Sequence, residues 1–232
     1  MSILKISDRI FQVKLKYVNA FILLEDNGLT IVDTGYSGSF KTLLKGIDQL
    51  GFSGKNVNRI IVTHCHPDHT GELHQAKVYF NAPVFMHTND AELVEEGRAG
   101  RVPYVVTPGI INRLVYLTKI QRVPINIAPT PVEEKLNSGD EISLLGGIYI
   151  VHTPGHSLGH ISLLFKEEGI LIAGDICANV MKLGLSPVNE DPEIAIQSIY
   201  KVTQFDFHKA CFGHGKPIWE DARRKLKEQF LR

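Results

Sequence analysis

The sequence is poor in cysteine and in long hydrophobic runs, and both shortages restrict the class of protein. Its three cysteines, Cys65, Cys177 and Cys211, are odd in number and widely spaced, which suits free thiols in a reducing compartment better than a disulfide framework. Residues 1–9 lack the apolar core of a signal peptide, and no apolar run approaches transmembrane length. We therefore expect a cytoplasmic protein.

The sequence also lacks a net charge, because 25 basic residues balance 25 acidic ones. Without a net positive field, we expect neither nucleic acid nor a membrane as a partner, and a small-molecule substrate fits better. The hydrophobic share of 44% and the charged share of 22% are typical of a globular protein. A chain of 232 residues can bury one large core, so we predict a single domain over residues 1–232.

Short apolar runs rich in Ile, Val and Phe alternate with turn residues and predict a sheet with helical crossovers. Residues 3–32 have the pattern of antiparallel strands, and residues 40–50 have helical spacing. Asp191 and Pro192 suit the cap and first position of a helix that extends to Thr203. Further strands are predicted at residues 58–63, 84–87, 148–153, 161–165, 170–173 and 210–212, and further helices after Asn89 and at residues 220–230.

Residues 97–134 interrupt this pattern with five prolines, and we predict a helical insert there. One helical face of the insert is apolar and consists of Ile110, Ile111, Leu114, Val115 and Leu117. This helix either packs on the core or serves as a lid, a substrate wall or a dimer contact, and the sequence leaves these alternatives open. An apolar helix of this kind is compatible with a homodimer.

Residues 63–71, Thr-His-Cys-His-Pro-Asp-His-Thr-Gly, place four metal-ligand side chains directly after a predicted buried strand. They are His64, His66, Asp68 and His69. Two histidines at positions i and i+2 can face one ion, and Asp68 with His69 can turn towards a second ion. Imidazole and carboxylate ligands without thiolates suit Zn²⁺, Mn²⁺ or Fe²⁺, and they do not suit a structural zinc site.

Three more polar residues stand at the ends of apolar strands, namely His156, Asp175 and His214. Each has a glycine beside it, and glycine permits the tight loop that can aim a side chain into a shared cleft. Seven ligands with one shared carboxylate are enough for two metal ions and leave room for water.

The remaining histidines lack a ligand-like setting, and we expect ordinary hydrogen bonds for them. Two of them, His87 and His152, are weaker candidates for supporting the ligands. The full set is His74, His87, His152, His160 and His208.

Together these residues resemble the metallo-β-lactamase superfamily, whose signature His-x-His-x-Asp-His is matched by residues 64–69. The resemblance continues, in the family's order, through the strand that ends in Asp33-Thr34-Gly35, the segments around His156 and Asp175, and Gly-His-Gly at residues 213–215. It implies an α+β fold, namely a four-layer αββα sandwich of two mixed β-sheets flanked by helices, with the metals at one edge.

The resemblance also implies a role for each ligand and a supporting role for the segment around Asp33. The first ion would be bound by His64, His66 and His156, and the second by Asp68, His69 and His214, with Asp175 as the bridge.

The chemistry expected of such a site is hydrolysis, because a metal-bound water has a pKa of about 7 and yields a metal-bound hydroxide at neutral pH. We expect Asp68 and Asp175 to be catalytic, with Asp68 orienting the hydroxide or passing its proton to the leaving group. A histidine at position 66 and a bridging Asp175 resemble the glyoxalase II and lactonase-type enzymes. We therefore predict a binuclear hydrolase that cleaves an ester-like bond, in a lactone, thioester or ester of a small molecule, with two divalent ions and zinc as the first choice.

Other functions stay open. Persulfide dioxygenases resemble glyoxalase II but hold one Fe²⁺ through two histidines and an aspartate, which His64, His156 and Asp175 match; the complete second site disfavours this oxidoreductase. A phosphodiesterase is a second alternative, and a non-catalytic metal-binding module is a third.

Overall fold

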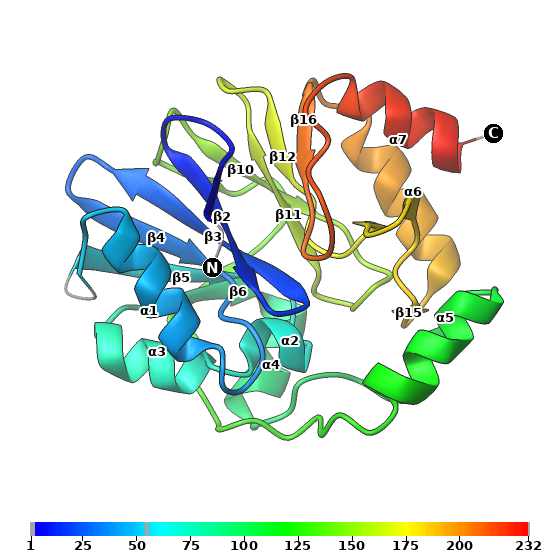
Figure 1. The fold of residues 1–232 in the computed structure, drawn as a ribbon, viewed down its shortest axis with the longest axis horizontal. Helices are drawn as coiled ribbons and strands as arrows, with labels where there is room; N and C mark the ends of the chain where they lie inside the picture. The colour runs from blue at the N-terminus through cyan, green and yellow to red at the C-terminus, as the bar shows by residue number, and fades with distance from the viewer. Residues whose placement is uncertain (1–2, 54–55, 232) are drawn as a thin grey trace. The chain divides into compact units, whose positions relative to one another are not determined.

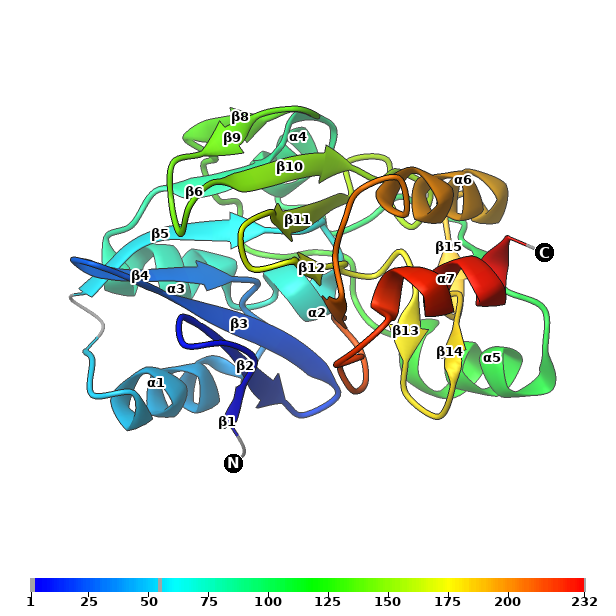
Figure 2. The same cartoon turned by 90° about the horizontal axis from the view of Figure 1, so that it is seen from above.

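A computed structural model of the chain describes residues 3–53 and 56–231. The chain divides into two compact units, Met1–Ala99 with Asn126–Leu136, and Gly100–Ile125 with Asn137–Arg232. Each unit has its own large sheet and its own hydrophobic core (Figures 1 and 2). The predicted insert at residues 97–134 is therefore shared between the two units.

The sheet of the first unit is mixed, with the strand order β1-β2-β3-β4-β5-β6-β8. Its first four strands pair antiparallel, as residues 3–32 predict, and β4, β5, β6 and β8 pair parallel. Gly28 forms the tight turn between β3 and β4 with a φ of 138°, a conformation that favours glycine. The bounds are β1 (Ile3–Lys5), β2 (Ile10–Leu15), β3 (Val18–Glu25), β4 (Gly28–Val32), β5 (Val57–Val62), β6 (Val84–His87) and β8 (Glu134–Leu136).

The helices of the first unit are α1 (Phe40–Gln49), α2 (Pro67–Thr70), α3 (Leu73–Phe80) and α4 (Thr88–Glu95). The buried side chains of α1, α3 and α4 share one hydrophobic cluster with the sheet, so these helices stabilise it by removing apolar area from water. The sequence pattern predicted α1 and α4 but not α3, whose buried face consists only of Leu73, Ala76 and Phe80. Its other apolar residues, Val78 and Tyr79, are exposed, so the apolar positions do not mark one helical face.

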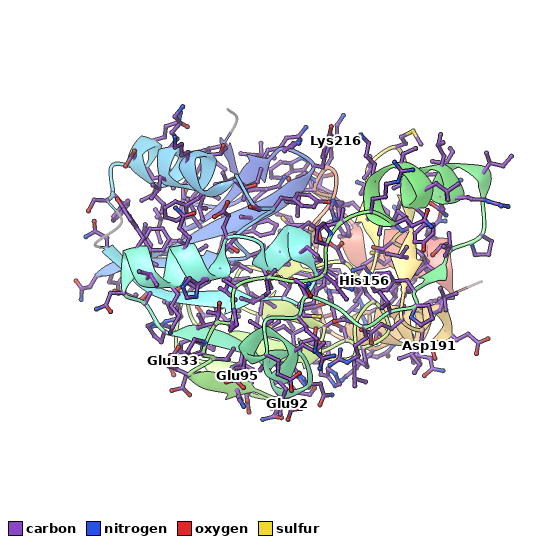
Figure 3. All side chains as sticks on the ribbon, turned by 90° about the horizontal axis from the view of Figure 1, so that it is seen from below. Glu92, Glu95, Glu133, His156, Asp191 and Lys216 are labelled. Carbon is purple, nitrogen blue, oxygen red and sulfur yellow. The ribbon has the colours of Figure 1, made fainter. Side chains whose placement is uncertain are left out.

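The chain returns to the first unit at residues 126–136, where polar contacts tie the returning strand to its neighbours. Lys77 Nζ lies 2.5 Å from Glu133 Oε1, and Val84 N donates to Glu133 Oε2 at 2.9 Å. Lys135 Nζ donates to Glu95 Oε2 at 3.1 Å. Figure 3 shows Glu95 and Glu133 on the same side of this unit. These pairs fix β8 at the edge of the sheet, next to β6.

The sheet of the second unit has the order β16-β12-β11-β10-β9 and is antiparallel apart from the β12–β16 pair. Two small pairs accompany it, β13 with β14 and β7 with β15. The bounds are β7 (Val105–Val106), β9 (Glu141–Ile142), β10 (Ile148–His152), β11 (Ile161–Phe165), β12 (Ile170–Ile172), β13 (Ala178–Asn179), β14 (Leu183–Gly184), β15 (Val188–Asn189) and β16 (Lys209–Cys211).

Two helices of the second unit, α6 (Pro192–Val202) and α7 (Ala222–Phe230), share a hydrophobic cluster with this sheet (Figure 1). Asp191 caps α6 as predicted, because its Oδ1 accepts from the backbone N–H groups of Glu193 and Ile194 at 2.9 and 3.0 Å, and Pro192 takes the first position. Within residues 3–53 and 56–231, no helix is both long enough and apolar enough to cross a membrane.

The insert contains α5 (Ile110–Val115), which continues as a π-helical turn, η2 (Tyr116–Ile120). Neither element has a buried residue. The exposed fraction is 88% for Ile110 and 60% for Leu114, so the predicted apolar face points to solvent within this chain. The first alternative, burial of that face in the core, is therefore wrong, and the roles as lid, substrate wall or dimer contact stay predictions.

Candidate metal centre

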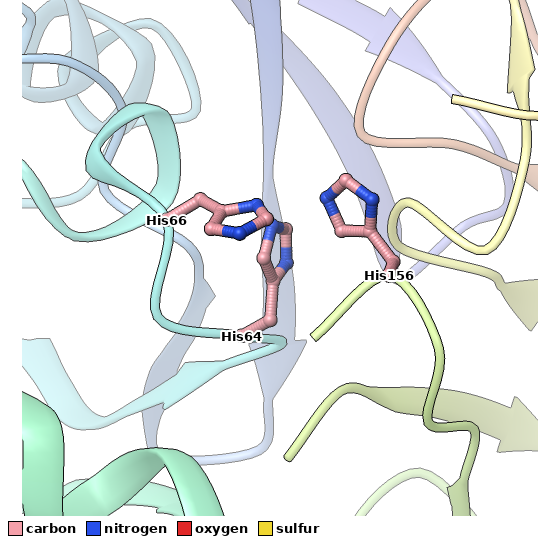
Figure 4. Close-up of side chains that lie close together, drawn as sticks. All are labelled: His64, His66 and His156. Carbon is pink, nitrogen blue, oxygen red and sulfur yellow. The ribbon is translucent and has the colours of Figure 1, made fainter. Parts of the chain in front are cut away.

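The first group of predicted ligands lies in the first unit, on the segment that leaves the carboxyl end of β5. Figure 4 shows the His64 and His66 side chains next to each other on this segment. They precede the short helix α2, which begins at Pro67 and carries Asp68 and His69. The His64 ring centroid lies 4.7 Å from that of His66 and 4.0 Å from that of His69, and His69 Nε2 lies 3.8 Å from Asp68 Oδ2. The four predicted ligands therefore converge, and the three histidines are buried.

Asp33 and Thr63 determine which nitrogen of two of these histidines carries its proton. Thr63 N and Thr63 Oγ1 donate to Asp33 Oδ1 and Oδ2, both at 2.8 Å, and His69 Nδ1 donates to Asp33 Oδ2 at 2.8 Å. Because the Thr63 hydroxyl proton points to Asp33, its oxygen accepts from His64 Nδ1 at 3.1 Å. In the neutral rings the lone pair is then on Nε2, which suits a metal ligand. The predicted supporting role of Asp33 agrees with these contacts.

Hydrogen bonds between side chains and the backbone hold the segment of residues 64–71 in place. Cys65 N donates to Asp90 Oδ2 of α4 at 3.0 Å, and Thr70 Oγ1 donates to Cys65 O at 2.9 Å. A Cβ on Gly71 would lie 2.5 Å from Ser37 N, so only glycine permits this close approach of two backbone segments. Sequence reasoning missed Asp90, which has no pattern of its own because its partner is a backbone N–H 25 positions away.

The second group of predicted ligands lies in the second unit, each on a loop after a strand. His156 follows β10, Asp175 follows β12, and His214 follows β16. Asp175 Oδ2 lies 3.1 Å from His214 Nε2 and 3.7 Å from His156 Nε2. His156 and Asp175 are buried, whereas the His214 side chain is 19% exposed. The structure brings these three predicted ligands together, with the carboxylate within 4 Å of both imidazoles.

The segment around β15 orients His156 and links it to the insert. His156 Nδ1 donates to Val188 O at 3.0 Å, so Nε2 keeps the lone pair in this ring as well. Glu190 N donates to His156 O at 3.2 Å. On its other side β15 pairs with β7 of the insert, and Thr107 Oγ1 donates to Ser186 O at 2.6 Å. Through this contact, the position of the insert is coupled to that of a predicted ligand.

We expected ordinary hydrogen bonds for the histidines outside the ligand set, and His160 differs from this expectation. His87 Nδ1 caps α4 by accepting from Asn89 N, and His152 Nε2 donates to Leu158 O, so neither contacts a predicted ligand in these bonds. His160, which we had grouped with the ordinary histidines, accepts the backbone N–H of Asp175 at its Nε2 with a distance of 2.8 Å. Its position four residues after His156 was the only available signal.

The donor set fits divalent transition metals. It consists of imidazole nitrogens and two carboxylates, which suit Zn²⁺, Mn²⁺ or Fe²⁺. The nearest cysteine in sequence to Asp175, Cys177, is buried, and burial together with the Asp175 charge raises the pKa of its thiol far above the ordinary value. This thiol stays protonated at neutral pH and does not compete as a thiolate ligand.

Comparison with known proteins identifies the class. The metallo-β-lactamase superfamily model matches residues 13–214, most of the chain. A metallo-β-lactamase family protein from Thermus thermophilus superposes with a TM-score of 0.70 at 24% identity, covering 94% of this chain and 76% of that one. The fold is therefore the metallo-β-lactamase fold, of the α+β class, with mixed sheets flanked by helices. The chain belongs to the metallo-β-lactamase superfamily.

Similar sequences carry less information about activity. "Uncharacterized protein YobT" of Bacillus subtilis is 32% identical over 162 residues, which cover 68% of this chain and 61% of that protein. A "probable metallo-hydrolase" of Methanocaldococcus jannaschii is 28% identical over 158 residues, which cover 68% of this chain and 66% of that protein. The matches thus span slightly less than two thirds of these relatives.

Proposed function

We propose that the chain is a metal-dependent hydrolase with a binuclear centre made from both ligand groups. The first unit offers His64, His66, Asp68 and His69 as donors, and the second unit offers His156, Asp175 and His214. In this proposal Asp175 is shared between the ions. Zinc is the first choice, because the set combines imidazole with carboxylate and lacks thiolate.

The observation that carries the proposal is the fixed tautomer of three buried histidines. His64, His69 and His156 each donate Nδ1–H to a protein acceptor, at Thr63, Asp33 and Val188 respectively. A supporting acceptor on one ring nitrogen orients the other towards a metal and raises its basicity. The acceptors for His69 and His156 lie 36 and 32 positions from their partners, so chance proximity in sequence does not explain this common arrangement.

Divalent ions at these residues would supply Lewis acidity, which lowers the pKa of water and polarises a carbonyl or phosphoryl oxygen. The residues themselves hold and orient the donor atoms. Asp68 lies at the first turn of α2 with its side chain 16% exposed, so it can exchange a proton with solvent or a leaving group. Asp175 is proposed to contribute its carboxylate as a donor shared between the ions.

An ester-like bond in a small molecule is the proposed substrate, as a lactone, thioester or simple ester. The insert supports this choice, because β7 pairs with β15 beside His156 while α5 offers exposed aliphatic side chains. Exposed aliphatic side chains in an insert that pairs with the segment beside His156 suit a substrate with a hydrophobic portion.

Metal content of the purified protein tests the function. We expect about two zinc or manganese ions per chain, falling in Asp175→Ala and in His214→Ala, because each variant removes one donor. His208→Ala is the matched control, since His208 is exposed and outside both ligand sets. Metal-loaded protein should then hydrolyse members of an ester, thioester and lactone panel.

Two results would overturn the proposal. About one iron per chain that persists in His214→Ala, with thiol-dependent oxygen uptake, would indicate the mononuclear oxidoreductase instead. Absence of turnover on the whole panel and on a phosphodiester, despite full metal loading, would indicate a non-catalytic metal-binding module.

A further inference from the structure

His160 and Asp175 are connected by a contact that sequence reasoning did not anticipate. Asp175 lies three residues beyond the end of β12. Its N–H donates to His160 Nε2 at 2.8 Å, and its carbonyl accepts from Ser186 Oγ at 2.8 Å. Both backbone groups of this predicted ligand are therefore bonded to side chains, which fixes the point from which its carboxylate extends.

The tautomer of His160 follows from these bonds. A backbone N–H can only donate, so His160 Nε2 is an acceptor without a proton. The ring proton of the neutral imidazole is then on Nδ1, which donates to Thr153 Oγ1 at 2.8 Å. The Thr153 hydroxyl is left to donate, either to Ser162 Oγ at 3.1 Å or to His160 O at 3.4 Å, and Ser162 Oγ donates to Ala173 O at 3.0 Å. Each side chain in this series of hydrogen bonds therefore has a partner, and His160, Thr153 and Ser162 are all fully buried.

Gly174 leaves the space that the imidazole needs. A Cβ at this position would lie 2.5 Å from His160 Nε2, closer than any two unbonded heavy atoms of this kind pack. Gly174 also has a φ of 58°, which favours glycine. The glycine before Asp175 thus has a second purpose besides the tight loop, because it admits the ring that accepts the Asp175 N–H.

We propose that His160 is a positioning residue that holds Asp175 in place for metal binding through its Nε2 acceptor. This inference rests on the proposed metal function of Asp175. His160 does not contact the reacting atoms in this role and acts only through the Asp175 backbone. The His156 and His160 rings lie 5.9 Å apart at 89°, so the ring of His160 also packs edge-on against a second predicted ligand.

Two substitutions separate the acceptor from the bulk of the ring. In His160→Gln the amide oxygen can reach the place of Nε2 and accept the Asp175 N–H, whereas in His160→Asn the shorter amide can replace only Nδ1 and keep the Thr153 contact. The full-length protein, stripped of metal, is titrated with Co²⁺ by visible absorption and with Zn²⁺ in competition with a chromophoric chelator. His208→Asn is the matched control, because His208 lies in the same unit, is exposed and is outside the ligand set.

We expect His160→Asn to weaken binding of at least one ion by about tenfold to a hundredfold, the usual effect of removing a group that supports a ligand. His160→Gln should stay within about threefold of the wild type, and His208→Asn should be unchanged. Equal effects of the Asn and Gln variants, whether both weaken binding or neither does, would overturn the positioning role. Failure of the wild-type protein to bind either metal would instead overturn the proposed function.

A measurement on the wild-type protein remains decisive if the variants do not fold. Long-range ¹H–¹⁵N correlation spectra of histidine-labelled protein distinguish the two neutral tautomers, and we expect His160 to carry its proton on Nδ1 with and without Zn²⁺. A proton on Nε2 would contradict the bond to Asp175 N and, with it, the proposal.

Discussion

Substituting Asp33 by alanine should strongly destabilise the metal-free protein. The Asp33 carboxylate is 1% exposed and accepts three hydrogen bonds of 2.8 Å, from Thr63 N, Thr63 Oγ1 and His69 Nδ1. Alanine leaves all three donors buried, and each buried donor without an acceptor costs about 1–3 kcal/mol.

Two further effects modify the magnitude. Asp33 has a φ of 63°, and an alanine held in the left-handed region costs about 1 kcal/mol more. In the opposite direction, the variant no longer buries the Asp33 charge, and the avoided desolvation cost offsets part of the loss in stability. We therefore expect Asp33→Ala to lower the free energy of unfolding by about 3–5 kcal/mol, a large part of the about 5–15 kcal/mol typical of a domain.

Urea unfolding followed by far-ultraviolet circular dichroism measures this loss, with a chelator present so that metal binding does not contribute. Asp26→Ala is the control, because Asp26 is 80% exposed and pairs only on the surface with Arg9, a contact worth about 0.2–1 kcal/mol. Asp33→Asn should be intermediate, since asparagine tolerates a positive φ and keeps one acceptor. A loss of less than about 1 kcal/mol in Asp33→Ala would refute the assignment of these three bonds.

Three other predictions concern surface charge, thiols and the insert. Partial burial opposes ionisation of Glu133, but the hydrogen bond from Lys77, the bond from Val84 N and the Lys77 charge outweigh it, so the pKa of Glu133 lies below its usual value of 4.5. Glu133→Gln should therefore lose at most about 1 kcal/mol at pH 7 after solvent screening, and urea unfolding should show the difference disappearing as the pH falls through the folded pKa. Burial raises the pKa of Cys211 to about 12, and all three cysteines are buried, so a thiol reagent at pH 8 should label the native protein far more slowly than the unfolded one; rapid native labelling would contradict this. Replacing Ile110 and Leu114 by serine should change the kcat/KM ratio between long-chain and short-chain esters without changing metal content or melting temperature, and an unchanged ratio would refute a substrate role for α5.

The sequence by itself identified the candidate metal ligands. His64, His66, Asp68 and His69 are recognisable because four ligands in six positions have no other common purpose, and the cap at Asp191 is recognisable because capping is local. Buried strands were also predictable from local sequence, because a continuous apolar run can be identified without knowing which strand it pairs with.

Only the tertiary structure decided how these ligands are supported. The acceptors that orient His69 and His156 lie 36 and 32 positions away, and one of them is the backbone carbonyl of Val188, which leaves no trace in the residue type. The same holds for His160, whose partner is a backbone N–H 15 positions away. Exposure of the apolar face of α5 was likewise undecided, because periodicity identifies a face and does not identify its neighbour. Hydrogen bonds between distant segments depend on where the folded chain brings atoms together, and spacing along the sequence carries no such information.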